Sequence, residues 1–294
     1  MGFYKRYILS VILLQTAVCS FSQPFTDIIN ASAQSFSTHY RDSLKSKNYT
    51  NNYFLNVLFP KELKNGNVLL IRINAEWLNS YYINSSVSRT SDLYAVSVPM
   101  GMQFLSPNKK WKFLTMAITK ISSDFSKIDN NSFQPGGILL ATYIKSENLK
   151  FKLGLYYSKE LFGDFFMPLA GIDWKATERL QFYGVLPSNY RIEYKLISGL
   201  YTGLNFKSYT RSYFLYIKNW NNYVKNREIQ LKIFLDYYFT KKMVAFVEFG
   251  RTIDYYILQF KQNNNKDAVT YNPIYTQFYD GFSIAVGAAY RIRK

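Results

Sequence analysis

The feature that most constrains this chain is an alternation of apolar and polar side chains, clearest in residues 227–239, where only Phe234 interrupts it. The apolar row begins at Ile229, and Glu228, Lys232 and Asp236 belong to the row that alternates with it. Successive side chains of a strand point to opposite faces, so this segment is a two-faced strand. In a soluble protein the apolar face would cover a core. In an outer-membrane barrel the apolar face contacts lipid, and the polar face lines the lumen.

The length of the alternating rows favours the membrane barrel. Alternation recurs from about Tyr53 to the end of the chain, for example over 69–77, 94–104 and 149–157. Rows of this length imply strands of about ten residues, which cross a bilayer at a tilt. Strands of globular proteins average about five to six residues. The 27 Tyr and 24 Phe agree with this interpretation, because aromatic residues suit strands, and Tyr also suits the membrane interface.

The predicted links between strands fall into two sets. Short links are expected at residues 60–67, 106–110, 146–147, 176–177, 208–209 and 240–242. Links that are mostly longer alternate with them, at residues 79–90, 121–133, 158–165, 187–190 (a short exception), 220–226 and 260–279. Short turns on one side and longer loops on the other are typical of outer-membrane barrels, whose turns are periplasmic. A soluble sandwich has no reason to sort its links in this way.

The strand count completes the prediction of the fold. Thirteen strands can be placed between Tyr53 and Ile292. Bacterial single-chain barrels have an even number, so one strand is missing, and residues 35–41 are the candidate. We therefore predict an all-β protein: a closed antiparallel transmembrane β-barrel of about 14 strands. Twelve strands is the fallback, with short periplasmic turns and longer extracellular loops.

The N-terminal segment predicts export. Lys5 and Arg6 precede an apolar run over 7–18 that is too short to span a membrane, and small residues follow up to Ser22. This indicates a cleavable signal peptide at 1–22, followed by one barrel domain at 23–294 in the outer membrane. An alternative lipid anchor on Cys19 is disfavoured because the preceding residue is a bulky valine.

The remaining composition narrows the classes of partner and site. Cys19 is the only cysteine, so a mature chain would contain neither a disulfide framework nor a thiolate metal site. We expect no cofactor, no metal site and no nucleic-acid partner, because no such motif is found. The last strand, over 281–292, resembles the closing strand that outer-membrane proteins present to the barrel-assembly machinery. That machinery and the outer-membrane lipids are therefore the expected partners.

The centre of the chain resembles a known family. Residues 162–196 carry the likeness, through Gly163, Pro168, Gly171, Trp174, Leu180, Leu186, Pro187 and Tyr194. The segment is similar to an uncharacterised family of outer-membrane β-barrel proteins of diderm bacteria, known only as a domain of unknown function. The resemblance implies a barrel in the outer membrane and supplies no activity. Pro168 and Pro187 are expected at the same rim of a hairpin, where a missing N–H ends strand pairing without cost.

The polar rows supply candidate lumen-lining residues. They are Lys150, Lys152, Asp173, Lys175, Arg191, Glu193, Lys195, Glu228, Lys232, Asp236 and Glu248. In a water-filled lumen, an excess of cations among the charged side chains would favour small anionic solutes. In the alternative interpretation these charges pair across neighbouring strands and fill a closed interior.

Three classes of function remain open. The leading hypothesis is a passive channel or small-solute transporter. The second is a non-transporting surface or envelope-organising barrel whose loops bind a partner. The third and weakest is a lipid-modifying enzyme, for which His39, near Ser35 and Ser37, is the one candidate base. We expect no enzyme, because residues for catalysis are scarce.

Overall fold

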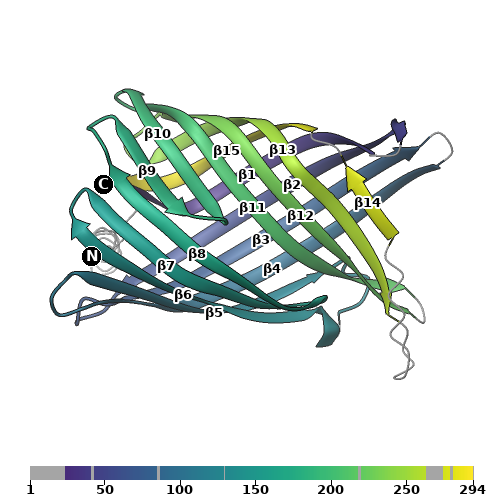
Figure 1. Ribbon diagram of the computed structural model, residues 1–294, viewed down its shortest axis with the longest axis horizontal. Helices are drawn as coiled ribbons and strands as arrows, with labels where there is room; N and C mark the ends of the chain where they lie inside the picture. Colours follow the sequence, from purple (N-terminus) through teal and green to yellow (C-terminus); the bar gives the residue numbers. More distant parts are fainter. Residues whose placement is uncertain are drawn as a thin grey trace, which may run out of the picture.

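The computed structural model describes residues 24–40, 43–84, 87–128, 130–217, 220–262, 274–278 and 281–293. The predicted signal peptide at 1–22 lies outside this part of the chain and stays a prediction. The described part forms one antiparallel sheet, in which the first strand pairs with the last and closes a barrel (Figure 1). The helix η2 (Asn130–Ser132) is short, and the described residues contain no helix long and apolar enough to cross a membrane.

The strand segments have the following bounds: β1 (Phe25–Tyr40), β2 (Ser43–Glu62), β3 (Val68–Asn84), β4 (Val87–Leu105), β5 (Trp111–Ser123), β6 (Phe133–Ser146), β7 (Leu149–Glu160), β8 (Gly163–Lys175), β9 (Leu180–Val185), β10 (Asn189–Ile197), β11 (Leu200–Ile217), β12 (Trp220–Tyr238), β13 (Met243–Gln262), β14 (Ile274–Phe278) and β15 (Gly281–Arg293). Segments β14 and β15 pair with β13 in one continuous register, at Tyr255↔Phe278 and Thr252↔Gly281. They are therefore two parts of one strand. The barrel has 14 strands, which confirms the predicted fold.

The strand expected at 35–41 exists, but it begins much earlier, at Phe25. It pairs with β2 on one side and with β15 on the other. Its outward row contains small residues such as Ala31 and Ala33, and its inward row contains Asn30 and Ser32. Small outward side chains give little hydropathy contrast, which explains why the alternation is weak there.

One predicted turn is wrong. Residues 208–209 lie inside β11, and the chain instead turns at residues 198–199, between β10 and β11. Gly199 has a φ of 81°, a conformation that glycine adopts without a steric penalty. Leu196, Leu200 and Leu204 keep the same alternation on both sides of this turn. A hairpin this tight leaves no gap in the pattern.

Most links at the loop end are shorter than predicted, because the strands extend into them. Strand β3 continues to Asn84, β4 begins at Val87, and β12 already begins at Trp220. The link over 124–132, which contains η2, is longer than the other described links at the loop end. Most of the predicted loop at 260–279 lies outside the described residues. These strand extensions are rich in Asn, Ser and Thr, and this loop-like composition explains why the sequence predicted longer links there.

The outer face of the barrel is apolar, and the inner face is mainly polar. On β12, Leu231, Ile233 and Leu235 are 40–59% exposed on the outside. Glu228, Lys232 and Asp236, on the other face, are at most 1% exposed. This is the arrangement of a barrel that meets lipid with its outer surface. The apolar row that begins at Ile229 therefore faces outward.

The barrel wall is irregular between β8 and β11. Strands β9 and β10 are short, so their hairpin fills only the half of the wall nearest the turns at 63–67, 106–110 and 239–242. The last bridge between β8 and this hairpin is Ala170↔Leu186. Pro168 and Pro187 lie just beyond that bridge, as expected for residues that end strand pairing. We call the half of the barrel near these turns the turn half, and the half near the links at 124–132 and 161–162 the loop half.

In the loop half the wall closes by overlap and by a single parallel bridge between β11 and β5, Phe214↔Ser123, instead of by a strand ladder. Ser212 on β11 alternates with the inward-facing Arg211 and Tyr213, yet it is fully buried. The Leu161 N–H donates to Ser212 Oγ at 3.0 Å, and Ser212 Oγ donates to Glu160 Oε2 at 2.6 Å. The tip of the β7–β8 hairpin therefore lies against the outer face of β11.

Candidate functional site in the barrel interior

Apolar side chains meet inside the barrel in the loop half. Leu78 of β3, Leu93 of β4, Tyr213 of β11 and Val224 of β12 form one buried cluster. Strands β3 and β4 lie on the opposite side of the barrel from β11 and β12 (Figure 1). Their inner faces therefore contact each other across the lumen. In the described conformation these side chains bridge the lumen between the two pairs of strands.

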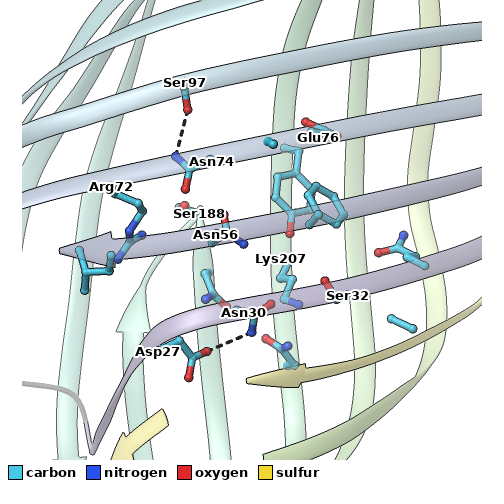
Figure 2. Close-up of a pocket in the computed structure, with 18 of the residues that line it drawn as sticks. Asp27, Asn30, Ser32, Asn56, Arg72, Asn74, Glu76, Ser97, Ser188 and Lys207 are labelled. Carbon is cyan, nitrogen blue, oxygen red and sulfur yellow. Dashed lines mark hydrogen bonds between the residues drawn. The ribbon is translucent and has the colours of Figure 1, made fainter. Parts of the chain in front are cut away.

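The interior of the rest of the barrel contains a cavity of about 530 Å³. One wall of the cavity, on β1 to β4, is lined mainly by uncharged amide and hydroxyl groups (Figure 2). This wall presents Asn30, Ser32, Asn56, Asn74 and Ser97. Asn74 Nδ2 donates to Ser97 Oγ at 2.9 Å, and Asn30 Nδ2 donates to Asp27 Oδ2 at 3.1 Å. Such groups can exchange hydrogen bonds with water or with a hydroxylated solute.

The other wall, which runs from β15 beside β1 to β10, carries paired charges. Arg291 bonds Asp27 through Nε and bonds Asp236 Oδ2 through a terminal nitrogen at 2.6 Å. Arg191 donates to the other oxygen of Asp236 at 2.8 Å. The Arg191 guanidinium also lies 3.4 Å from the ring centroid of Phe234. This contact accounts for the presence of Phe234 in the polar row of β12, because an inward ring can stack on a guanidinium.

A second group of paired charges lies further along the same wall. Glu248 accepts hydrogen bonds from Asn205 at 2.6 Å and from Lys207 at 3.0 Å. Lys232 Nζ donates to Gln34 Oε1 at 2.9 Å, and Gln34 Nε2 in turn donates to Glu228 at 3.0 Å. These bonds tie β1 to β12 across the interior. Buried charges need such partners, because an unpaired buried charge is costly.

The eleven predicted lumen-lining residues are placed as follows. Eight are buried: Lys152, Asp173, Arg191, Glu193, Glu228, Lys232, Asp236 and Glu248. Lys150 and Lys195 are half-buried, and Lys175 is exposed. Of the eleven, Arg191 and Glu248 border the cavity. Most of the buried ones are paired, as Lys152 is with Asp173 at 2.7 Å. Pairing across strands therefore dominates their environment, and a role in solute passage stays a prediction.

Sequence reasoning missed several charged residues that line the cavity: Asp27, Arg72, Glu76, Lys120, Lys207, Arg211 and Arg291. Arg72 and Glu76 alternate with the apolar row over 69–77, so that row could have identified them as inward-facing residues. Arg211 was missed because a turn was placed at 208–209. Asp27 precedes residues 35–41, where the sequence predicts the first strand.

Two other candidate features give no site in the described residues. His39 lies on β1 opposite Lys47, and its side chain is outside the described part. Among the residues whose positions are described, no group of three His, Cys, Asp or Glu side chains could hold a metal ion.

Comparison with known families places the chain. A family described as Domain of unknown function (DUF6268) matches residues 72–291, which is most of the sequence. The chain belongs to this family. The family expected from residues 162–196 is thereby confirmed, and its description supplies no activity. No curated protein matches the chain.

Solved structures of outer-membrane proteins are similar in architecture. The COG4313 outer membrane channel from Pseudomonas putida F1 is 9% identical, with 93% of this chain and 98% of that one covered and a TM-score of 0.43. The toluene transporter TodX of P. putida is 9% identical, with coverage of 90% and 88% and a TM-score of 0.41. The NanC porin is 9% identical, with coverage of 89% and 98% and a TM-score of 0.36. Similarity at this level carries no conclusion about what this chain does.

Proposed function

We propose that this protein is an outer-membrane channel for small polar solutes, exported through the signal peptide predicted at residues 1–22. The observation that carries the proposal is the polar cavity of about 530 Å³ inside the barrel. Its volume falls in the range of about 300–1,000 Å³ that is usual for small-molecule sites. The outer-membrane lipids contact the apolar outer face, and the barrel-assembly machinery inserts the chain.

The charges around the cavity support a preference for small anionic solutes. The lining contains six cationic side chains and three carboxylates: Arg72, Lys120, Arg191, Lys207, Arg211 and Arg291 against Asp27, Glu76 and Glu248. Rings of like charge set the ion preference of a narrow pore. Part of this excess is balanced by carboxylates just outside the lining, such as Asp236 and Glu160.

Passage requires the loop half to open. Leu93 and Tyr213 occupy facing walls of the closed cluster. Separation of the inner faces of β3–β4 and β11–β12 would connect the cavity to the loop end. The cluster is small, with two further partly buried side chains, Ala95 and Leu215, packed against it.

The test is conductance in planar bilayers. The mature chain and a Leu93→Ser/Tyr213→Ser variant are refolded, and folding is checked by heat-modifiable gel migration. We expect brief or rare openings from the native chain and larger, longer openings from the variant, with reversal potentials that indicate an anion preference. Leu153→Ser/Tyr194→Ser is the matched control, because it changes the same residue types on the outer face. The absence of conductance from both folded proteins would refute the channel.

A second candidate function is favoured by the closed loop half. A barrel whose lumen is blocked in its described state also suits a surface protein that binds a partner through its projecting hairpins. Removal of residues 81–88 from the tip of the β3–β4 hairpin should then abolish partner binding without unfolding the barrel. A conducting native chain would argue against this alternative.

A further inference from the structure

We propose that Arg72 forms a binding site in the cavity for the oxyanion group of a small hydroxylated solute. The proposal rests on the channel function only in assuming that a solute can reach the cavity. Arg72 lies on β3, between Leu70 and Asn74 on the inward face. Its side chain is exposed within the barrel interior and directed into the cavity (Figure 2).

Arg72 differs from the other cations of the cavity lining because it has no bonded carboxylate. The other five all have one: Lys120 with Glu160, Arg191 with Asp236, Lys207 with Glu248, Arg211 with Glu76 and Glu228, and Arg291 with Asp27 and Asp236. Among the residues that the structure describes, Arg72 makes no hydrogen bond and no ion pair within 4 Å. The lining therefore contains one guanidinium whose donors are free for a solute.

The neighbouring carboxylate does not supply the missing partner. Asp27 is close enough to Arg72 to interact with it electrostatically. Both of its oxygens already accept hydrogen bonds from Arg291, and one also accepts from Asn30. The carboxylate of Asp27 is therefore already bonded to Arg291 and Asn30. It lowers the positive potential at Arg72 without occupying the donors of the guanidinium.

The chemistry of the site determines the class of ligand. A guanidinium presents a rigid fork of N–H donors that fits a carboxylate or phosphate in bidentate geometry. Asn56, Asn74 and Ser188 line the same cavity and can exchange hydrogen bonds with hydroxyl groups. Leu58 and Leu70, both buried nearby on β2 and β3, limit the hydration of that side. The site therefore fits a solute with one oxyanion and several hydroxyl groups.

The test is a binding measurement, so that it does not depend on conductance. Gluconate, glycerol 3-phosphate and neutral sorbitol are titrated calorimetrically into the folded barrel. We expect gluconate or glycerol 3-phosphate to bind and sorbitol not to bind, and the stronger of the two anions identifies the oxyanion. In Arg72→Gln the affinity should fall by about tenfold or more, because a charge-assisted contact is lost. Arg72→Lys should retain part of the affinity.

Arg179→Gln is the matched control, since Arg179 is exposed in a turn outside the cavity. Equal affinity of the native protein and Arg72→Gln would overturn the site, and so would sorbitol binding as tightly as the anions. If the native protein gives no heat, the Leu93→Ser/Tyr213→Ser variant opens the loop end for the same titration, and no binding there overturns the proposal as well. Conductance without binding dependent on Arg72 refutes the site alone. Binding dependent on Arg72 in a barrel that never conducts refutes the channel and keeps the site.

Discussion

The loop half and the turn half of this barrel follow the same alternation but enclose different interiors. In the loop half the inward row contains Leu78, Leu93, Tyr213 and Val224, and the facing walls pack against each other. In the turn half the inward row is mainly polar or charged, apart from the buried cluster of Leu58, Val68 and Leu70, and a cavity separates the walls. Burial of apolar surface stabilises the folded state by about 25 cal/mol per Å². Burial of charged groups destabilises it unless each charge is paired. The identity of the inward residues therefore decides where a barrel of this size stays open.

The largest effect is expected where the turn half depends on paired charges. Arg291→Gln should destabilise the folded barrel by about 3–5 kcal/mol, because breaking a buried ion pair leaves an unpaired charge. Here the change would leave Asp27 without its cation and Asp236 with Arg191 alone. Urea unfolding in vesicles measures the loss, and the exposed Arg179→Gln is the control. Equal stability of the two variants would show that the charge network does not hold the turn half.

The apolar outer surface is common to both halves, so a charged substitution on it should destabilise the barrel in either half. Leu231 is 43% exposed on the outside, near the middle of β12. Leu231→Arg should cost about 2–4 kcal/mol if the residue lies at the bilayer midplane. Lys232→Leu should cost less, because Lys207, at 3.0 Å, would still neutralise Glu248 after the bond to Gln34 and the longer ion pair of Lys232 with Glu248, at 3.9 Å, are lost. Equal costs at the two positions would argue against a lipid-facing outer surface.

A smaller effect is expected from the apolar contact of the loop half. Tyr213→Ala removes a large, fully buried side chain from the cluster. The loss should be about 2 kcal/mol, at the low end for large-to-small core changes, because the adjoining cavity lets water enter. Unfolding and conductance are measured on the same preparation. A large loss of stability without any gain in conductance would mean that the cluster is a structural core and not a closure.

The sequence predicts this architecture far better than it predicts the interior. The alternation in β12 correctly predicted that Leu231 faces outward and Lys232 faces inward, since the period of a strand is independent of its neighbours. The turn at Gly199 escaped detection because Leu196, Leu200 and Leu204 continue one row through it. The unpaired state of Arg72 depends on which side chains meet across the barrel, and that is set by register and by overlap. Neither leaves a local signal in the sequence.

The smallest effect should come from the overlap that closes the wall of the loop half. Ser212 accepts a hydrogen bond from Leu161 N–H and donates one to Glu160, whose side chain also accepts from Lys120 at 2.6 Å. Ser212→Ala should therefore cost only about 1 kcal/mol, the usual net value of a hydrogen bond. Ser208→Ala is the matched control, since Ser208 faces the same side of β11 and its side chain makes no hydrogen bond in the described part of the structure. If the two variants unfold alike, the β7–β8 hairpin merely rests on β11. A larger loss of stability in Ser212→Ala, together with more frequent channel openings, would show that this contact keeps the loop half closed. The turn half would remain unaffected.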